Sequence, residues 1–558
     1  MVMDYFNLGA YRRKVTTVSA DAQTWFDRGL VWCYSFNHDE AFQCFERSAK
    51  ADPECGMAYW GMAYAIGPNY NKSWSRFDLD DFQKTAKRAH AVIQRGRSAR
   101  NTRPMERALI EAIATRFPPA DTIPDDFTPL NLAYPKEMRH VFEEFGEDID
   151  VAFLYADALM CIRPRKLWDL DTGNPTGPDI VEAKSILEAA LACSDGRNHP
   201  GISHLYIHMM EMTPNPEKAL NAADRLRHLV PDGSHMQHMA KHIDIACGDY
   251  RRGIESNRDA MISDDKYFSH YEGSSLYQVY RCHNIHVLIY AAMMAGRFED
   301  ALEAANHLQE ILTPEFLSIK SPPIVDWAEF QCSIMAHVFI RFGHWDGILL
   351  LELPDDPELL SITTTMIRYA RGVALSALGR VQEAEVEKLE FEAARRAVPE
   401  TRQYGIACSA ELVFQVASQM LEGELEYRRG NCETAFDHLR KAIHLEDNLP
   451  YADPPVWLQP VRHALGALLL EQGQIEQATE VYKQDLGLTE NLPRRKARIN
   501  NVWALHGLYE CFIRGGHHEA ARKIRLHRDI AVAAADVPVA CSCFCRVSAV
   551  KEKGGCCE

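Results

Sequence analysis

Small, aromatic and other apolar residues recur among polar ones along the chain, at spacings that are typical of antiparallel helix pairs. In DRGLVWCYSFNHDEAFQCFERSAKADP, Gly29 is followed by Ala41 after 12 residues, by Phe45 after 4 more and by Pro53 after another 8. Small residues allow two antiparallel helices to approach closely, and an aromatic ring such as Phe45 fills the gap between them. Proline ends the second helix. Adding 34 to Gly29 gives Ala63, where a second pair is predicted to begin.

Glycine turns that precede amphipathic stretches repeat the pattern through the rest of the chain. They are predicted at Gly248, Gly296, Gly379, Gly430, Gly473 and Gly515, each followed by a second helix. The alanines of the last three pairs, at 435, 478 and 520, lie 43 and 42 residues apart, longer than the usual 34. These spacings are typical of tetratricopeptide (TPR) repeats. We therefore predict an all-α fold without clear strands: a TPR-like α-solenoid, a right-handed superhelix of antiparallel helix pairs.

Three stretches interrupt this pattern and suggest a division of the chain. Residues 117–135 (FPPADTIPDDFTPLNLAYP) are rich in proline and are predicted to be extended, and WDLDTGNPTGPD (168–179) has the composition of a loop. The expected organisation is TPR helix pairs at 1–116, a connection and loop-containing insert at 117–180, a continuing solenoid at 181–535 and an irregular cysteine-rich tail at 536–558.

Composition limits the classes of function. Of 558 residues, 47% are hydrophobic and 25% charged, as in an ordinary folded protein. The longest apolar stretch, around His286–Gly296, is shorter than the roughly 18–20 residues of a membrane-spanning helix. The first residues contain no signal-peptide pattern, so a cytoplasmic location is expected. A net charge of −17 argues against nucleic-acid binding through phosphate neutralisation.

Histidines are concentrated in one region. Ten of the 23 lie between residues 199 and 286, where an even distribution would place about four. They form three stripes with helical spacing: His204, His208 and Glu211; His235, His238 and His242; and His283 and His286. Residues three or four apart share one face of a helix, which is suitable for holding a metal ion. Neighbouring first helices of a solenoid would bring the three stripes together.

The predicted metal ligands are His204, His208, His238, His242, His283 and His286, with His235 and Glu211 as alternate ligands or orienting partners. A single pair of histidines four residues apart usually lies on the surface or packs in the core. The alternatives to a metal site are a buried hydrogen-bonded network of neutral histidines and a pH-sensitive surface. Imidazole suits zinc, copper, iron and nickel. The zinc-protease motif HExxH is absent, and a dinuclear copper centre would be consistent with two histidine triads.

Cysteines form a second cluster at the C-terminus. Five of the 16 lie within the last 18 residues, at 541, 543, 545, 556 and 557. In an extended chain, Cys541, Cys543 and Cys545 project to the same side, and soft thiolates at this spacing suit Cu(I) or zinc. The tail is therefore a candidate for metal capture. A redox-labile tail, or lipidation of Cys556 and Cys557, is the alternative.

The chain resembles a group of long TPR-domain proteins of bacteria and filamentous fungi. The resemblance rests on segments including SFNHDEA, HPGISHLYIHMMEM, HMQHMAKHI, HNIHVLIYAAMMAGR, PPVWLQPVRHALG and the terminal SCFCR, and covers most of the chain. The shared positions are His38, His199, His204, His208, Glu211, His235, His238, His242, His283 and His286. One departure is Lys241, where relatives are expected to read HMPSHI. Fungal members often lie in secondary-metabolite gene clusters, which implies a tailoring role.

Two classes of function follow. The first is a metal-dependent oxidative enzyme that uses copper, the preferred metal, or iron on a small-molecule substrate, with zinc-assisted hydrolysis as a variant; no catalytic residue is assigned. Copper is preferred because the CxCxC tail could deliver or retain it. The second is a non-catalytic scaffold that binds a protein or peptide in its concave groove. Peptide-binding TPR grooves usually display Lys, Arg and Asn, whereas histidines are expected here, which favours the enzyme.

Overall fold

The computed structural model of the chain describes residues 5–119, 124–271 and 275–547. Within these ranges the regular elements are α-helices, short 3-10 helices and one hairpin whose strands have two residues each. The prediction of an all-α fold is therefore confirmed. The hairpin, β1 (Gln403–Tyr404) with β2 (Cys408–Ser409), is the small exception, and Gly405 allows its turn with a φ of 66°.

Two compact units divide the chain. Unit 1 comprises Met1–Ile243 and Ser256–Arg281, and unit 2 comprises Asp244–Glu255 and Cys282–Glu558. The helices of unit 1 are α1 (Ala20–Tyr34), α2 (His38–Ala51), α3 (Gly56–Ile66), η1 (Trp74–Arg76), α4 (Leu79–Ser98), α5 (Pro104–Ala114), α6 (Thr128–Phe145), α7 (Ile149–Met160), α8 (Pro178–Ala192), α9 (Ser194–Arg197), α10 (Pro200–Met210), η2 (Pro216–Ala219), α11 (Leu220–Leu229) and α12 (Ser234–Met239). Three helices contain residues of both units: α13 (Lys241–Ala246), α14 (Tyr250–Phe268) and α15 (Ser275–Ala295). Unit 2 continues with α16 (Phe298–Ile311), α17 (Pro314–Leu317), α18 (Ile324–Ala328), η3 (Glu329–Ser333), α19 (Ile334–Phe342), α20 (Trp345–Leu349), α21 (Ser361–Ala377), α22 (Val381–Ala397), α23 (Ala410–Arg428), α24 (Cys432–Asp447), α25 (Val461–Glu471), α26 (Ile475–Asp485), η4 (Arg494–Lys496), α27 (Val502–Arg514) and α28 (His518–Ala534).

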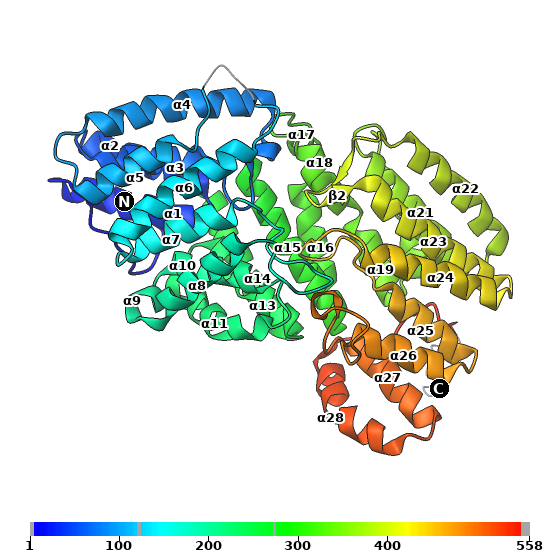
Figure 1. Cartoon of the computed structure of the whole chain (residues 1–558). Coiled ribbons are helices and arrows are strands. Elements are labelled where there is room, and N and C mark those ends of the chain that lie inside the picture. Colours follow the sequence, from blue (N-terminus) through cyan, green and yellow to red (C-terminus); the bar gives the residue numbers. More distant parts are fainter. Residues whose placement is uncertain (1–4, 120–123, 272–274, 548–558) are drawn as a thin grey trace. The chain divides into compact units, whose positions relative to one another are not determined.

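Consecutive helices pack as pairs in both units (Figure 1). In unit 1, α1 packs on α2, α3 on α4, and α7 on α8. In unit 2, the pairs are α21 with α22, α23 with α24, α25 with α26, and α27 with α28. Each pair contacts the next along the chain, for example α2 with α3 and α26 with α27. This serial stacking is that of a TPR-like α-solenoid.

The ring of Phe45 occupies the position that the spacing predicts. A Cβ atom placed on Gly29 of α1 would lie 2.8 Å from the ring, and one on Gly61 of α3 would lie 2.5 Å from it. Phe45 is therefore packed between the two helices that flank α2, and its side chain is fully buried. Tyr482 of α26 packs in the same way between Gly466 of α25 and Gly507 of α27. The Gly–aromatic spacing of 16 residues thus has the same structural meaning in both units.

The predicted turn glycines have the left-handed conformation that ends a helix. Gly248, Gly296, Gly379, Gly430 and Gly473 have φ between 74° and 87°, and the second helix of each pair begins two residues later. Only glycine adopts this conformation readily, so the turns explain why glycine recurs there.

The last helix pair is shifted by one residue from the prediction. Gly516, not Gly515, has the positive φ, of 73°, and α28 begins two residues after it. Similarly, Ala521 is buried against the pair at 2% exposure, whereas Ala520 is only partly buried. The alanines at 435, 478 and 521 are therefore evenly spaced.

Part of the proline-rich segment is helical, so the prediction that all of 117–135 is extended is wrong. Helix α6 begins at Thr128, with Pro129 in its first turn. Backbone N–H groups of the first turn have no acceptor within the helix, so a proline there costs no hydrogen bond. Pro135 lies inside the same helix and is buried. The segment 168–179 has the irregular conformation that its Gly and Pro residues predict, up to the start of α8 at Pro178. Residues 536–546 of the tail contain no helix.

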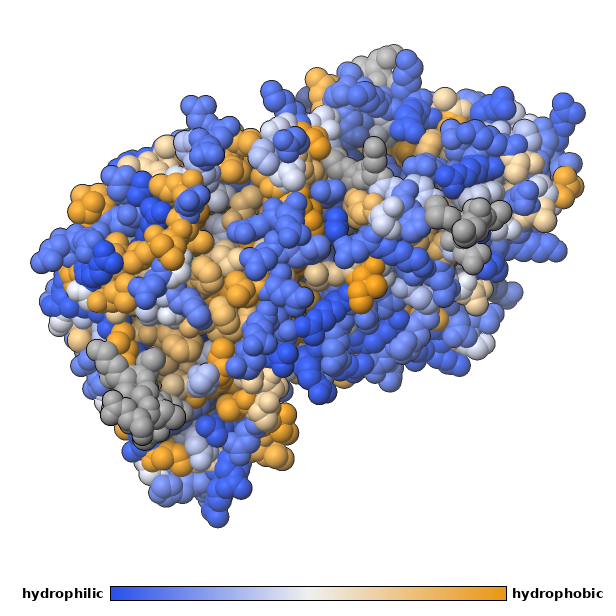
Figure 2. All heavy atoms as spheres, turned by 180° about the vertical axis from the view of Figure 1, so that it is seen from behind, coloured by the Kyte–Doolittle hydropathy of each residue, from blue (hydrophilic) through white to orange (hydrophobic). Residues whose placement is uncertain are grey.

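Hydrophilic residues cover most of the face seen in Figure 2, with hydrophobic ones between them. This agrees with the acidic composition of the chain. Across the described residues, no helix has both the length and the apolar character that crossing a bilayer requires.

Candidate metal centre

Helix α10, which carries the first histidine stripe, is fixed at its N-terminus by His199. The His199 Nδ1 atom accepts a hydrogen bond from the backbone N–H of Ile202 at 3.1 Å, and Pro200 occupies the first helical position. The His199 Nε2 atom donates to Asp150 Oδ1 at 3.2 Å. Both ring nitrogens are therefore used, so His199 is a capping residue and holds α10 in place.

His204 is oriented by the backbone of α1. Its Nδ1 atom lies 2.6 Å from the carbonyl oxygen of Tyr34. A carbonyl oxygen only accepts, so the proton of the neutral ring is on Nδ1 and the lone pair is on Nε2. The Nε2 atom is buried and has no hydrogen-bond partner among the described residues. Metal-ligating histidines use this arrangement, with one nitrogen anchored and the other free.

Glu211 orients two further histidines. Its Oε1 atom lies 2.8 Å from Nδ1 of His208, and its Oε2 atom lies 2.5 Å from Nδ1 of His242. Because the carboxylate accepts from His208 Nδ1, the lone pair of that ring is also on Nε2, and this atom is buried without a hydrogen-bond partner in the described chain. Glu211 is thus placed to support the imidazoles, one of its two predicted roles.

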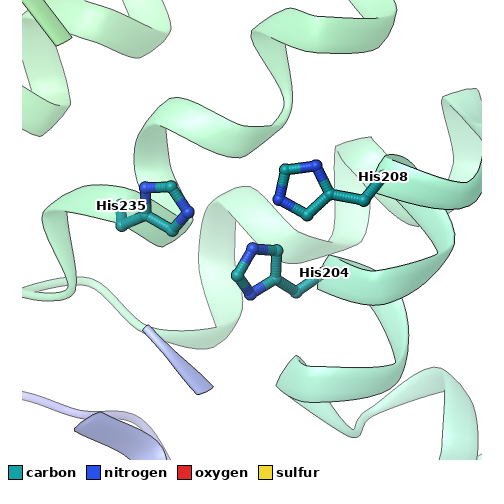
Figure 3. A group of neighbouring side chains, drawn as sticks. All are labelled: His204, His208 and His235. Carbon is teal, nitrogen blue, oxygen red and sulfur yellow. The ribbon is translucent and has the colours of Figure 1, made fainter. Parts of the chain in front are cut away.

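His235 on α12 completes a three-histidine group with the two residues of α10. The ligand nitrogens of His204, His208 and His235 all lie within 4.8 Å of one another, and the three rings face a common space (Figure 3). A tetrahedral ion with bonds of about 2.0–2.1 Å separates its ligand nitrogens by about 3.3 Å, so modest closure of the rings would hold a metal. His235, predicted as an alternate, is central in this geometry.

His238 and His242 extend the cluster from the same stripe. The centroid of the His238 ring lies 5.5 Å from that of His235 and 5.2 Å from that of His242. Its Nδ1 atom donates to the side-chain oxygen of Asn257 at 2.7 Å, so His238 is anchored like His204. The first two predicted stripes therefore meet in unit 1.

The third stripe belongs to unit 2. His286 is buried on α15, with its ring centroid 5.4 Å from that of Phe330, and His283 is partly buried on the same helix. Both are on the part of α15 that unit 2 contains. The group His204, His208 and His235 is complete within unit 1.

Burial makes two histidines of the cluster harder to protonate. Burial lowers the pKa of His204 well below its usual range, and the nearby His208 lowers it further. Burial also lowers the pKa of His242 to about 3 against the opposing effect of Glu211, with Lys241 adding to the decrease. Burial raises the pKa of Glu211, but the interactions with His242 and His208 outweigh burial and hold this pKa well below its usual range. The lowered pKa values favour the neutral form of His204 and His242, which is the form that can bind a metal ion through a ring nitrogen.

Aromatic rings that the sequence did not single out enclose the group. The Phe36 ring centroid lies 4.4 Å from that of His204 and 5.0 Å from that of His235. Tyr70 lies 4.7 Å from His208, and Tyr280 lies 5.3 Å from His235, measured between centroids. Phe36 has a φ of 56°, which is rare for a residue other than glycine and often marks a functional position. In the sequence, Phe36 is marked only by its place in the FNH motif (Phe36–His38).

The remaining residues of that motif have separate roles. The Asn37 side chain accepts a hydrogen bond from Glu40 N at 3.2 Å and caps α2, as is usual for asparagine before a helix. The His38 ring stacks on Phe36 with centroids 5.7 Å apart, and both of its nitrogens are buried without a hydrogen-bond partner in the described chain. Burial, with Arg116 and Lys72, lowers the pKa of His38 to about 3.

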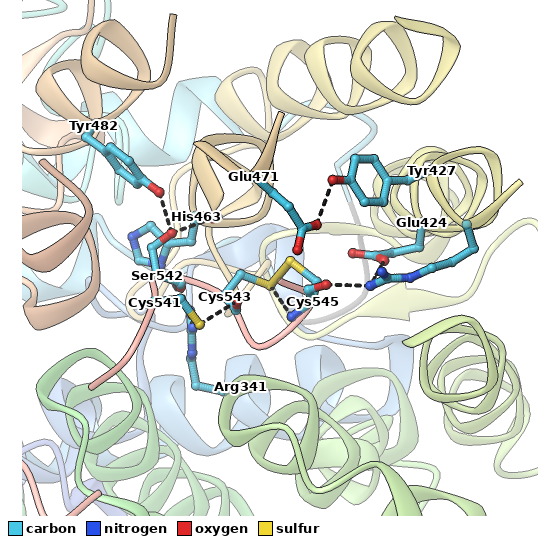
Figure 4. Close-up of a disulfide and its surroundings, with 11 residues drawn as sticks. Arg341, Glu424, Tyr427, His463, Glu471, Tyr482, Cys541, Ser542, Cys543 and Cys545 are labelled. Carbon is cyan, nitrogen blue, oxygen red and sulfur yellow. Dashed lines mark hydrogen bonds and ion pairs between the residues drawn. A yellow bond between two sulfur atoms is a disulfide. The ribbon is translucent and has the colours of Figure 1, made fainter. Parts of the chain in front are cut away.

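The three tail cysteines that were predicted to capture a metal lie in unit 2. Cys543 and Cys545 form a disulfide, and Cys541 is buried with its thiol donating to the carbonyl oxygen of Cys543 at 3.0 Å (Figure 4). Disulfide sulfurs are not thiolates, so metal capture at this site would first require reduction.

Comparison with known proteins gives only distant similarity. No protein-family model matches the chain, and no curated protein matches it. Among solved structures, a human IFIT1 dimer with PPP-AAAA is 13% identical, with 91% of this chain and 89% of that chain covered and a TM-score of 0.33. Yeast Tom70 is 9% identical, with 92% of each chain covered and a TM-score of 0.30. The TPR domain of P58(IPK) is 12% identical, with 89% and 99% covered and a TM-score of 0.22. These values are too low to support an argument about function.

Proposed function

We propose that unit 1 binds one transition-metal ion through His204, His208 and His235, and that the chain is a helical-repeat scaffold built around this centre. The observation that carries the proposal is the pair of anchored rings on α10. His204 and His208 each use Nδ1 in a hydrogen bond and keep a buried Nε2 without a hydrogen-bond partner in the described chain. Buried polar atoms are rarely left unsatisfied, so a bound ion is the natural partner.

The donor set limits the metal. Three neutral imidazoles suit zinc, copper, iron or nickel, and disfavour calcium and magnesium, which prefer oxygen ligands. The sequence favours copper because a CxCxC tail could deliver it. With Cys541 buried and the other two sulfurs in a disulfide, that reason becomes weaker, and copper, iron and zinc are equal candidates.

A metal-dependent enzyme acting on a small molecule is one role for the centre. Three protein ligands leave one position open on a four-coordinate ion, as in catalytic sites, whereas structural sites are closed by four protein ligands. Oxidative chemistry would need copper or iron, and hydrolysis would suit zinc. Fungal members of the group that the chain resembles often lie in secondary-metabolite gene clusters, which favours a small-molecule substrate.

A non-catalytic interaction scaffold is the second role, and it has the broader support. Helix pairs run through both units, whereas the catalytic role depends on a few residues of one unit. All three proposed ligands are also buried, with exposed fractions of 3% or less, as a structural ion that stabilises the helix stack would require. In this role the ion fixes α10 against α12.

Metal analysis tests the proposal. The protein should be purified without a histidine tag, incubated with each metal, desalted and measured by elemental analysis. The wild type is expected to retain about one equivalent, and His204→Ala with His208→Ala to retain under about a tenth of that, since two of three ligands are removed. The matched control replaces the exposed His140 and His527 by Ala and should bind like the wild type. Metal-free wild-type protein, or unchanged binding in the ligand variant, would overturn the proposal.

Azide binding separates the two roles. The cobalt- or copper-loaded protein is titrated with azide, and its visible spectrum is recorded. A catalytic centre with an open position should bind azide and shift the ligand-field bands. A structural centre in which a fourth protein ligand closes the coordination sphere should leave the spectrum unchanged, and this result would exclude the enzyme while retaining the metal site.

A further inference from the structure

The tail of the chain lies against the first helices of several pairs in unit 2. Residues 539–546 have no helix or strand, yet Val539, Cys541, Ser542 and Cys545 are buried at 4% exposure or less. Hydrogen bonds to the tail come from the first helices α19, α23, α25 and α27 and from one residue, Tyr482, of the second helix α26. Figure 4 shows the contacts of Arg341, His463 and Tyr482. In TPR-like arrays the first helices form the inner face, where partners bind.

Three side chains of the inner face bind carbonyl oxygens of the tail. His506 Nε2 lies 3.2 Å from the oxygen of Ala540, and Arg341 donates to the oxygen of Ser542 at 2.5 Å. Arg428 donates to the oxygen of Cys545. Main-chain contacts of this kind provide affinity for an extended peptide with little dependence on its sequence.

Side chains of the tail add the selective contacts. Ser542 donates its hydroxyl to the carbonyl oxygen of His463 at 2.8 Å and lies 2.6 Å from the hydroxyl of Tyr482. Arg546 Nη1 lies 2.8 Å from both carboxylate oxygens of Glu510 on α27. Ser542 and, four residues later, Arg546 are therefore tail residues whose side chains contact the helices.

The Arg341 contact is prepared by a buried network. Arg341 donates to His463 Nδ1 at 3.0 Å, and His463 Nε2 lies 2.9 Å from Asp485 Oδ2. Asp485 in turn pairs with Arg498 at 3.1 Å. The guanidinium is thus held rigidly toward the tail carbonyl, and a rigid donor loses little entropy on binding.

We infer that the inner face of unit 2 is a peptide-binding groove and that the chain's own segment 539–547 is its resident ligand. The partner class that fits is an extended protein segment with serine and, four residues later, arginine, bound mainly through its carbonyl oxygens. The tail occupies the groove in cis and blocks such a partner until it is displaced. This inference does not depend on the metal centre of unit 1.

Removal of the tail tests the inference. A chain that ends at Pro538 is mixed with a fluorescein-labelled peptide of sequence 539–547 carrying the Cys543–Cys545 disulfide, and binding is followed by anisotropy. The truncated chain should bind the peptide at least about tenfold more tightly than the intact chain, because a tethered ligand has an effective concentration of about a millimolar. Peptides with Ser542→Ala and Arg546→Ala are the matched controls and should bind several-fold more weakly. A truncated chain with wild-type helicity and a cooperative melt that binds no peptide would show that the tail is only a structural plug.

A second variant covers a truncation that does not fold. In the full chain, Arg546→Glu places two carboxylates together at Glu510, and Ser542→Ala removes both hydroxyl contacts. This double variant should release the tail and bind the labelled wild-type peptide at least about tenfold more tightly than the unaltered chain. No gain in binding by the folded double variant would overturn the inference.

Discussion

Glu211 Oε1 lies 2.8 Å from Nδ1 of His208, and this contact sets the tautomer of the ring. His204 is fixed differently, by the backbone carbonyl of Tyr34 at 2.6 Å, which no side-chain substitution removes. Of the two groups that orient the histidines of α10, Glu211 is therefore the one that a substitution can test directly.

Glu211→Gln should weaken metal binding without removing a proposed ligand. A glutamine can accept from one histidine but presents its NH2 group to the other, so His208 and His242 cannot both keep their present orientation. Loss of an orienting carboxylate typically reduces metal affinity about 10–100-fold. Competition with a chromophoric chelator measures the dissociation constant. Glu217→Gln, at an exposed position of η2, is the matched control and should leave the constant unchanged. Equal affinities for both variants would remove Glu211 from the site.

The histidine stripes show how far the sequence leads toward the site. Helical spacing predicts that His204 and His208 share one face, and they do. It does not determine which residue of the second stripe joins them, because that depends on how α12 packs against α10. His235, predicted as an alternate, lies in one group with His204 and His208, and the predicted ligand His242 lies in another with His208 and Glu211. Phe36 was missed because a left-handed phenylalanine in a turn has no periodic signal.

The turns show the same limit in the fold. Single glycines such as Gly430 and Gly473 are predicted correctly, because only one residue at each turn tolerates a positive φ. The last turn has two adjacent glycines, and local sequence does not decide between Gly515 and Gly516. Packing of Ala521 against its pair selects the second one. Pattern therefore predicts the helix pairs, and tertiary contacts fix the register.

Gly61→Ala should destabilise unit 1 through a clash with Phe45. The added methyl group would lie 2.5 Å from the ring, and overpacking of this kind costs about 1–3 kcal/mol of the free energy of unfolding. Gly96→Ala on α4 is the matched control, because its nearest neighbour would lie 3.4 Å away. Alanine is favoured over glycine in helices, so the control should be neutral or slightly stabilising. Urea unfolding followed by circular dichroism measures both. If both variants unfold at the same urea concentration, the close packing of Phe45 is wrong.

Glu329 should make unit 2 less stable as the pH rises. Burial raises the pKa of this carboxyl group to about 7, against opposing hydrogen bonds from Thr363 and Ile362 and the charge of Arg402. Between the unfolded pKa near 4.5 and about 7, the folded state binds a proton that the unfolded state has lost. The contribution of Glu329 to the free energy of unfolding is therefore fully present below pH 4.5. It decreases as the pH rises from about 4.5 to about 7, by at most about 1.4 kcal/mol per pH unit.

Glu329→Gln isolates this contribution. The amide oxygen can still accept from the backbone N–H groups of Ile362 and Thr363, but it has no charge to bury. Near pH 5 the variant and the wild type should have similar unfolding free energies, and at pH 8 the variant should be more stable by about 1 kcal/mol or more. Urea unfolding at the two pH values gives the comparison. Glu358→Gln, a substitution at an exposed position, should change neither value. A variant that gains no stability at pH 8 would show that Glu329 ionises freely.

Tyr482→Phe should loosen the tail while leaving the core of unit 2 intact. The ring fills the space between Gly466 and Gly507 and is retained, whereas the hydroxyl that lies 2.6 Å from Ser542 Oγ is lost. Loss of one buried hydrogen bond costs about 0.5–1.5 kcal/mol, and Tyr482→Ala, which also empties the space, should cost about 3–5 kcal/mol. Hydrogen exchange of residues 540–547, followed by mass spectrometry, should be faster in the Phe variant. Exchange in α25 and α27 should stay at the wild-type rate, because their packing is unchanged. Equal acceleration across the tail and both helices would mean that the hydroxyl supports the whole unit and not the docked tail alone.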